Sequence, residues 1–382
     1  MENKFIVDQK LLLSLLLSMQ PICTKRTALD ATSSILFQVG HKELVLKSTD
    51  LEISLQASCQ LMESDVDKNC SFLVSGRRIF DVVKELEGQI SCVLTSTQLS
   101  LQAGEVFLSL NIQDAQEFPP FPERIENLMQ LDAPLLLKMV DSVGFLIPQN
   151  NGNPALNGLL LELSPDFLKM TTTDGHSLAQ VSTAKATFNE PRTWLLPRRA
   201  IFELKKILEM VQDKTLFLGM CGNQLVFSGE LFNFFTRILV DQFPDYKAIL
   251  SKDEFVPATI DRSRLLKTLR RSTCLLLANQ FVPTKFSFAR GNVRVSMTNK
   301  EVGTLDEQLP VTGSVPKQVV MYLYAPFLLH GIQAFHDNDL AFYVKSGVNP
   351  IFFESHSDDF SMTYLVMPVS PTVARHDFEG IS

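Results

Sequence analysis

Two short stretches, "EFPPFPE" at residues 117–123 and "QFPDYKAIL" at residues 242–250, decide how this chain is organised. Each places proline directly after phenylalanine, and the two phenylalanines, Phe118 and Phe243, lie 125 residues apart. That interval is the length of an ordinary domain, and repetition at a fixed interval governs a fold prediction. We therefore expect three copies of one unit, at residues 1–125, 126–252 and 253–370, and then a tail at residues 371–382.

Helical patterns repeat at nearly the same interval. The stretches "SGRRIFDVVKEL" (75–86) and "LPRRAIFELKKIL" (196–208) place paired arginines 121 residues apart, and "LYAPFLLHGIQAF" (323–335) follows at a similar interval with weaker likeness. Each copy also opens with a short strand and then a helix, in "DQKLLLSLLLSM" (8–19), "LDAPLLLKMVDSV" (131–143) and "IDRSRLLKTLRRS" (260–272). Asp132 and Asp261 stand where helix caps are expected.

Strand patterns fall between these helices in one order. In the first copy, a strand at 4–7 leads to a helix at 9–19 and three strands, and "SFLV" (71–74) leads to a helix at 77–86 and three more. The second copy repeats the order around a helix at 198–210. We predict an α+β fold in which each copy holds two β-α-β-β-β units, with helices covering one face of antiparallel sheets.

Composition limits the class of protein. With 382 residues, 45% of them apolar and 20% charged, the chain is an ordinary globular sequence long enough for two or three domains. The six cysteines form no C-x-x-C pair, which favours reduced thiols in the cytoplasm and neither disulfides nor a zinc site. The apolar run "LLLSLLLSM" (11–19) is too short to span a bilayer, and the spacing of Leu12, Leu15, Leu16 and Met19 predicts a half-buried helix.

The stretch "TTTDGHSLAQ" (171–180) raises the question of catalysis, because Asp174, His176 and Ser177 are the groups of a nucleophilic triad. Triads are assembled from distant segments, since neighbours on one strand point to opposite faces. Asp174-Gly175 is instead a two-residue hairpin signal between strand-like runs. The chain also has no phosphate-loop, H-E-x-x-H or G-x-S-x-G motif. We therefore predict no catalytic residue, no metal site and no cofactor.

Five stretches together resemble the bacterial β sliding clamps, the processivity subunits of the replicative DNA polymerase. They are "STDLEISL" (48–55), "TDGHSLA" (173–179), "LPRRAIFELKKIL", "QFPDYKAIL" and "YLVMPV" (364–369), and their order covers nearly the whole chain. The resemblance implies a head-to-tail homodimer that closes into a ring around duplex DNA, with helices lining the hole and sheets outside. It also implies a cytoplasmic, nucleoid-associated protein whose partners are the replicative polymerase, the clamp loader, repair polymerases, ligase and mismatch-repair proteins. The loader, rather than this chain, would hydrolyse ATP.

Charge placement agrees with this resemblance, although the net charge is −7. The cations fall on or beside the predicted helices, so a ring with inward helices would have a basic hole suited to phosphate contact without base readout. The alternative is that each cation belongs only to the solvated face of its helix. The predicted DNA-binding residues are Lys25, Arg26, Arg77, Arg78, Lys138, Arg198, Arg199, Lys205, Lys206, Lys267, Arg270 and Arg271, and Lys84 and Arg264 complete the cationic set. Of these, Arg26 matches a DNA contact of the family.

The resemblance further implies a hydrophobic cleft that captures short peptides from partner proteins. By position it would comprise Leu156, Thr173, Gly175, His176, Leu178, Pro244, Ile249, Leu365, Met367, Pro368 and Val369. Leu178 and Ile249 suit ordinary core packing equally well. The residues that match the family's subunit interface are Leu108, Leu110, Leu275 and Leu276.

Departures from the family pattern leave alternatives open. Ser177 and Ala248 stand where many clamps carry arginine, and the loop "QNNGNPA" (149–155) lacks the basic and aromatic residues often found there. These departures leave peptide selectivity open, and they also suit a divergent paralogue that binds partners as a scaffold without being loaded onto DNA. The tail "PTVARHDFEGIS" starts beside the cleft, so Phe378 or Ile381 could fold back and compete with partner peptides; otherwise the tail is a terminus without a role.

Overall fold

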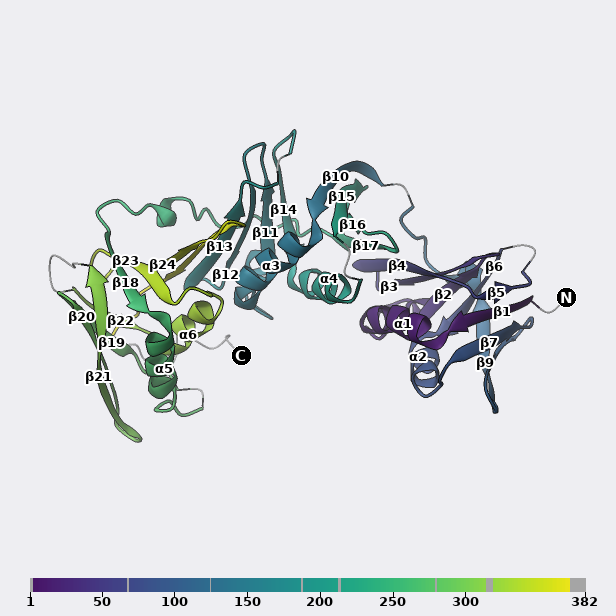
Figure 1. The fold of residues 1–382 in the computed structure, drawn as a ribbon, viewed down its shortest axis with the longest axis horizontal. Coiled ribbons are helices and arrows are strands. Elements are labelled where there is room, and N and C mark those ends of the chain that lie inside the picture. The colour runs from purple at the N-terminus through teal and green to yellow at the C-terminus, as the bar shows by residue number, and fades with distance from the viewer. Residues whose placement is uncertain are drawn as a thin grey trace. The chain divides into compact units, whose positions relative to one another are not determined.

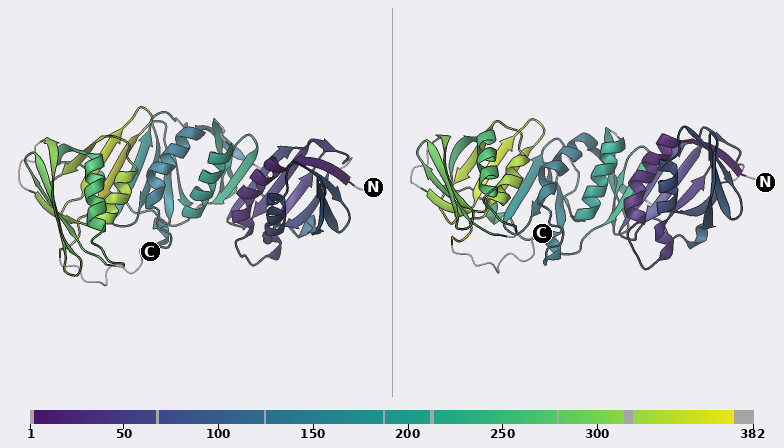
Figure 2. Two further views of the ribbon diagram at one scale, coloured as in Figure 1. Left: turned by 60° about the horizontal axis from the view of Figure 1, so that its bottom comes forward. Right: turned by 90° about the horizontal axis from the view of Figure 1, so that it is seen from below.

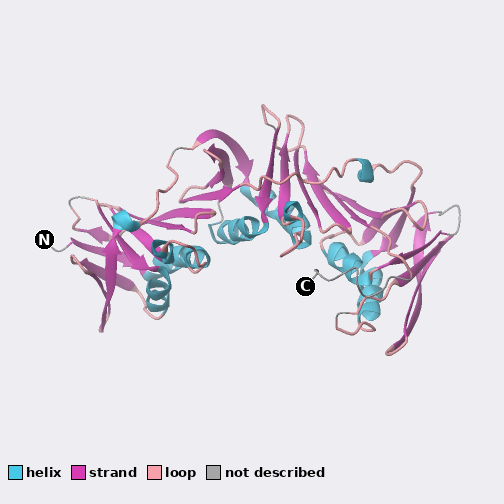
Figure 3. Cartoon of the chain, turned by 180° about the vertical axis from the view of Figure 1, so that it is seen from behind, coloured by secondary structure: helices cyan, strands magenta, loops and turns pink. Residues whose placement is uncertain are grey.

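The computed structural model of the chain describes residues 3–66, 69–123, 125–186, 188–211, 214–278, 280–313 and 319–371. The chain divides into two compact units, which we call unit 1 (Met1–Pro134 with Phe202–Ile238) and unit 2 (Leu135–Ile201 with Leu239–Ser382). Each unit holds one antiparallel sheet, and the helices of each unit gather on one face of that sheet (Figures 1 and 3). The α+β fold with antiparallel sheets is therefore confirmed.

Unit 1 is built on a sheet that, over the described residues, has thirteen strands. Their order is β10 (Glu126–Asp132), β15 (Thr215–Cys221), β16 (Gln224–Ser228), β17 (Phe232–Arg237), β4 (Ile53–Gln60), β3 (Glu43–Thr49), β2 (Ser34–Val39), β6 (Cys70–Ser75), β9 (Val106–Asp114), β8 (Gln98–Ala103), β7 (Gln89–Leu94), β1 (Asn3–Asp8) and β5 (Glu63–Ser64). Helices α1 (Gln9–Cys23) and α2 (Gly76–Lys84) lie side by side against it, as both views of Figure 2 show.

Helix α1 shows how the sequence specifies these elements. The Asp8 carboxylate caps its first turn by accepting hydrogen bonds from the N–H groups of Lys10 (3.0 Å) and Leu11 (3.1 Å). Leu12, Leu16 and Met19 are completely or almost completely buried, so the predicted half-buried helix is confirmed. No helix among the described residues is long and apolar enough to cross a membrane.

Unit 2 is built on a sheet that has twelve strands over the described residues. Their order is β14 (Arg192–Pro197), β11 (Gly158–Leu163), β12 (Leu168–Thr173), β13 (Ser177–Thr183), β25 (Ser361–Val366), β24 (Ile351–His356), β23 (Asp339–Val344), β18 (Val256–Asp261), β21 (Gly303–Gly313), β20 (Asn292–Asn299), β19 (Thr284–Ala289) and β22 (Val319–Leu323). Its helices are α5 (Arg262–Thr273), α6 (Ala325–Gln333) and most of α3 (Ala133–Val143).

The helices predicted from the repeats are confirmed. Those expected at 77–86 and 198–210 are α2 and α4 (Arg198–Val211), and their ends differ from the prediction by two residues or fewer. Asp261 caps α5 as expected, because its Oδ1 accepts a hydrogen bond from the Arg264 N–H at 2.6 Å.

The two units do not follow the three predicted copies, because each sheet continues across a boundary between copies. β4 of the first copy pairs with β17 of the second, and β13 of the second pairs with β25 of the third. The strands of the central copy are thereby shared between the two sheets. The boundaries at residues 125 and 252 remain predictions.

Candidate functional site

The turn between β12 and β13 is held by the Asp174 carboxylate. Its Oδ1 accepts hydrogen bonds from the backbone N–H groups of His176 (2.8 Å) and Ser177 (2.6 Å), and the Thr173 hydroxyl donates to the Ser177 carbonyl at 2.6 Å. Burial raises the pKa of Asp174, while these N–H groups oppose the rise. Gly175 adopts a φ of +93°, which costs glycine no Cβ strain. The predicted hairpin is confirmed, and the carboxylate of the apparent triad serves the backbone of that turn.

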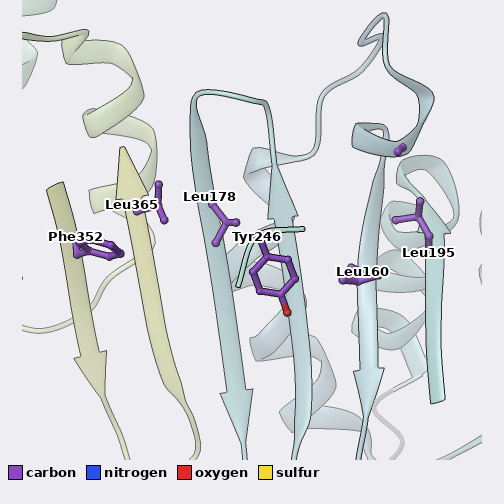
Figure 4. Packing of buried hydrophobic residues seen from close by; sticks show 7 residues of the cluster. Leu160, Leu178, Leu195, Tyr246, Phe352 and Leu365 are labelled. Carbon is purple, nitrogen blue, oxygen red and sulfur yellow. The ribbon is translucent and has the colours of Figure 1, made fainter. Parts of the chain in front are cut away.

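An apolar cluster lies beside this turn. Leu178 of β13 pairs with Leu365 of β25, and their exposed fractions are only 4% and 2%. We define the apolar cluster as these two residues with Ala155, Leu160, Leu195, Tyr246 and Phe352 (Figure 4). Partly buried residues that pack against it are Leu239, Phe243, Leu250, Phe255, Tyr343 and Met367. The cluster therefore draws residues from strands β11, β13, β14, β24 and β25 and from the segment 239–255, all within unit 2.

Other residues of the predicted cleft reach the same place. A Cβ on Gly175 would lie 3.7 Å from Cδ1 of the buried Leu156. The Met367 N–H donates to the His176 carbonyl at 2.9 Å, which fixes the end of β25 beside the turn. Thr173 is buried, and Pro368 and Val369 are half-buried.

Leu178 and Ile249, which suited core or site equally well from sequence, differ in the structure. Leu178 belongs to the buried cluster, whereas Ile249 is 46% exposed on the short 3₁₀ turn Ala248–Leu250. Pro244 is also exposed. Leu178 is therefore a core residue of the cluster, whereas Ile249 and Pro244 are accessible to solvent.

Tyr364 positions the neighbouring strand β25. Its side chain is fully buried, and its hydroxyl donates to the Phe327 carbonyl at 2.8 Å. The ring fits because Gly331 of α6 has no Cβ, which would lie 1.9 Å from the Tyr364 Cε1. Any larger residue at Gly331 would collide with the Tyr364 ring and disturb the packing of α6 against β25.

Sequence reasoning missed a row of aromatic rings that begins at His176. The imidazole stacks on Phe327, with ring centroids 5.5 Å apart, and Phe327 meets Tyr324 edge to face at 5.0 Å. Tyr324 in turn stacks on Phe281 at 4.5 Å. These three residues are more than 100 positions away from "TDGHSLA" in the sequence; Phe281 belongs to none of the quoted stretches, and Tyr324 and Phe327 belong to "LYAPFLLHGIQAF", which predicted only a helix. The aromatic pair in "LYAPF" is the only signal in the sequence that points to them.

Many of the predicted DNA-binding cations already face carboxylates. Lys25 contacts Glu52 and lies 3.7 Å from Asp50, while Lys138 lies 2.8 Å from Asp359. Hydrogen bonds from Lys138 and Lys185 lower the pKa of Asp359 to about 2. The further pairs are Arg77 with Asp81, Lys205 with Glu209, Lys206 with Glu203, and Arg271 with Glu307. Exposed pairs of this kind stabilise a fold little, but each lowers the net positive charge that its cation offers to DNA.

Four cations of the predicted set remain available: Arg26, Arg78, Lys267 and Arg270 are exposed and form no ion pair with a described residue. The helices also differ in charge. Cations concentrate on α2, α4 and α5, whereas α1 and α3 are leucine-rich with one lysine each. The guanidinium of Arg198 donates to the Ile147 carbonyl at 3.0 Å, so part of that side chain serves the fold.

The leucines that match a subunit interface lie on or near open strand edges. β9 pairs with β8 through 106–111 and with β6 only through 112–114, so one edge of 106–111 has no partner among the described strands. β21 has a similar open edge at 303–310, because it pairs with β18 only at 311–313. Leu108 and Leu110 on β9, and Leu275 and Leu276 after α5, are half-buried.

Two further expectations concern the C-terminal tail and the absence of a metal site. Residues 372–382, with Phe378 and Ile381, lie outside the described residues, so competition by the tail remains a prediction. Over the described ranges, no group of three or more His, Cys, Asp or Glu side chains is placed to hold a metal ion.

Comparisons with known proteins cover nearly the whole chain. Family models of the DNA polymerase III beta subunit match in succession, with the N-terminal domain at 3–122, the central domain at 130–245 and the C-terminal domain at 247–370. A beta sliding clamp of Pseudomonas putida is 27% identical over 312 residues, which are 80% of this chain and 84% of that protein. One of Staphylococcus aureus is 22% identical over 353 residues, which are 90% and 93% of the two chains.

Solved structures agree in fold. A sliding clamp of Pseudomonas aeruginosa, bound to griselimycin, superimposes with a TM-score of 0.88 at 23% identity, covering 97% of this chain and 100% of that one. The sliding clamp of Bacillus subtilis gives a TM-score of 0.87 at 17% identity, with the same coverage.

Proposed function

Since the chain belongs to the DNA polymerase III beta subunit family, we propose that it works as a sliding clamp, which encircles duplex DNA and tethers the replicative polymerase for processive synthesis. The observation that carries this proposal is the succession of three beta-subunit domains, in family order, between residues 3 and 370. A protein of this kind acts by enclosing its substrate, so we assign it no catalytic step.

The apolar cluster and its exposed rim support a peptide-binding site within unit 2. Leu178 and Leu365 would form an apolar floor, and the exposed Pro244 and Ile249 adjoin, in sequence, Phe243 and Leu250, which pack against the cluster. Sites of this kind bind through a few apolar anchors and a small number of polar groups. Because Ser177 is buried and position 248 is alanine, apolar contact rather than arginine pairing would supply most of the affinity there.

Contact with DNA falls first to the available cations Arg26, Arg78, Lys267 and Arg270. Each phosphate contact releases condensed counterions and carries no sequence information, which suits a ring that must move along DNA. Lys25, Arg77, Lys138, Lys205, Lys206 and Arg271 would contribute less, because neighbouring carboxylates partly neutralise them.

The open edges of β9 and β21 support a homodimer. An unpaired edge is a ready template for another strand, so β9 of one copy would pair with β21 of a second copy and vice versa. Leu108 and Leu110 on one side, and Leu275 and Leu276 on the other, would supply the apolar contacts of the seam. Two such contacts, one for each β9–β21 pair, would close the ring.

The remaining partners follow from the same site. The clamp loader, repair polymerases, ligase and mismatch-repair proteins would compete for the peptide-binding surface of each subunit, in the cytoplasm at the nucleoid. The scaffold alternative keeps these partners but removes loading onto DNA.

Loading on circular DNA separates the two functions. The purified chain is incubated with nicked circular DNA, a clamp loader and ATP, and is then passed over a sizing column. We expect retention on the circle and release after the DNA is cut, because only an enclosing ring is trapped by topology. A matched reaction without ATP should show no retention. Partner binding without retention would favour the scaffold, and retention that survives linearisation would contradict the sliding clamp.

A further inference from the structure

The segment 239–255 carries two residues of the proposed peptide site, Pro244 and Ile249, yet its backbone is weakly attached to the sheet. The Leu239 N–H donates to the Leu195 carbonyl at 2.8 Å. Between there and β18, the backbone N–H groups donate only within the segment among the described residues, as Ile249 does to Tyr246 at 3.1 Å. Side-chain contacts must therefore hold the segment 239–255, which would form one wall of the peptide site, in place against the sheet.

Tyr246 is the first side-chain anchor. It is 5% exposed within the apolar cluster, and its hydroxyl donates to the carboxylate of Glu162 on β11. Burial and that carboxylate both raise the pKa of Tyr246, so the hydroxyl keeps its proton at neutral pH. Phe243 meets the same ring edge to face, with centroids 6.0 Å apart. Figure 4 shows the Tyr246 ring lying across the strands of the sheet.

Lys252 is the second anchor. Its ammonium contacts the carboxylate of Glu354, which is only 7% exposed, and lies 4.8 Å from the ring centroid of Tyr343. Glu354 also accepts a hydrogen bond from the Thr363 hydroxyl at 3.0 Å. A buried carboxylate held in this way is a fixed point of the sheet, because leaving it unpaired is costly.

Ile249 stands three residues after Tyr246 and three residues before Lys252. The 3₁₀ turn Ala248–Leu250 that presents it has no backbone bond to a described strand of the sheet. The two anchors therefore span the exposed part of the wall, one on each side.

We propose that Tyr246 and Lys252 are positioning residues for partner binding: by holding the segment 243–252 to Glu162 and Glu354, they fix the wall of the peptide site before a partner arrives. This inference rests on the proposed peptide-binding function. Neither anchor needs to touch the peptide. Their effect is on preorganisation, because a wall that is already fixed loses less conformational freedom when the peptide binds.

The test measures the affinity of the full-length chain for the replicative polymerase subunit of the same organism, by calorimetry, together with thermal unfolding. Tyr246→Phe and Lys252→Met should each weaken binding about tenfold, and the two changes together about a hundredfold, since the anchors are separate. Arg192→Met, which breaks the exposed Arg192–Glu190 pair in the same unit, is the matched control and should bind like the native chain.

A double variant distinguishes positioning from general stability. Lys252→Met leaves the buried Glu354 carboxylate without its ammonium partner, so it should lower the unfolding temperature as well as the affinity. Adding Glu354→Gln removes that charge and keeps an acceptor for Thr363, so the unfolding temperature should recover while the affinity stays about tenfold weak. Native affinity in Lys252→Met/Glu354→Gln, or in Tyr246→Phe, would overturn the inference. Failure of the native chain to bind the polymerase subunit would instead contradict the proposed function.

Discussion

Units 1 and 2 each contain the same strand junction, but the residues at matching positions differ. In unit 1, the turn Thr49–Ile53 joins β3 to β4, and Asp50 Oδ1 accepts hydrogen bonds from the N–H groups of Glu52 (3.0 Å) and Ile53 (2.8 Å). That is the arrangement of Asp174 in unit 2. The pairing strand repeats as well, because the Arg237 N–H donates to the Glu52 carbonyl at 2.9 Å, the same length as the bond between Met367 and His176.

The side chains on this shared backbone are different. Where unit 2 has His176, Leu178 and Met367, unit 1 has Glu52, Ser54 and Arg237, as the two strand registers show. In unit 1 the matching core position, Phe235, is covered by Phe121 of the stretch 117–123, with ring centroids 5.5 Å apart. The ammonium of Lys47 lies 5.0 Å from the centroid of the Phe121 ring. The same backbone arrangement thus occurs in both units. The side chains at a few matching positions decide whether the junction presents apolar or charged groups.

The largest expected effect comes from exchanging these side chains. His176→Glu with Met367→Arg gives unit 2 the residues of unit 1 at two partly buried positions. Both charged side chains must lose water when an apolar peptide covers them, and the peptide itself offers them no polar partner, so binding of the polymerase subunit should fall by a factor of about one hundred or more. The measurement is calorimetric titration of the full-length chain.

The reciprocal exchange is its control. Glu52→His with Arg237→Met changes the matching positions of unit 1, and we expect partner affinity to stay native, because unit 1 keeps Ser54 and a covered Phe235. Loss of partner binding in the unit 1 variant, or native affinity in the unit 2 variant, would show that the two junctions do not divide their roles in this way.

An intermediate effect is expected at the aspartates that hold the two turns. Asp50→Ala and Asp174→Ala each remove an acceptor of two backbone hydrogen bonds, and each should lower the free energy of unfolding by about 2 kcal/mol. Asp174→Asn keeps an acceptor and should cost less. Denaturant unfolding of the three variants and the native chain measures this, and equal stability of Asp174→Ala and the native chain would contradict it.

Because of Asp174, the free energy of unfolding should also depend on pH. Its pKa is raised in the folded chain, so the folded state holds that proton more tightly than the unfolded state does. Ionisation of Asp174 therefore costs stability at neutral pH, and the cost is relieved as pH falls below the folded pKa. The native chain should gain stability relative to Asp174→Asn on acidification.

The sequence predicted the fold well because repetition is visible in residue types. The paired arginines located helices α2 and α4, and Asp174-Gly175 located a turn. It did not predict that sheets would cross from one copy to the next, because the pairing of β13 with β25 joins residues nearly 190 positions apart and leaves no local signal.

The candidate site was predicted from sequence only in part. The resemblance named residues that do gather in unit 2, including Leu178, Leu365 and Met367. It missed the aromatic row from His176 to Phe281 and the anchor at Lys252, because such contacts depend on tertiary packing. The charge pattern of the sequence also presented Lys25 and Lys138 as available cations, whereas both face carboxylates that are distant in sequence.

The smallest effect is expected at Leu51 and Gly175, the residues that directly follow Asp50 and Asp174 in the two turns. The two turns differ there only in the side chain. Gly175 and Leu51 both have positive φ, +93° and +74°, and each N–H donates to the preceding threonine hydroxyl at 3.1 Å. An L-residue in this region is strained by about 1–2 kcal/mol, and glycine avoids that strain but loses more chain entropy on folding, by about 0.5–1 kcal/mol. Gly175→Ala should therefore lower the free energy of unfolding by about 1 kcal/mol. It should do so without a clash, since its Cβ would lie 3.7 Å from Leu156.

Leu51→Gly should change stability by less than about 0.5 kcal/mol, because relief of strain is offset by added chain entropy and by loss of a half-buried side chain. Denaturant unfolding of both variants beside the native chain gives the two numbers. If Gly175→Ala were neutral and Leu51→Gly costly, the conformations of the two turns would not be equivalent, and the difference between the units would begin in the backbone rather than in the side chains.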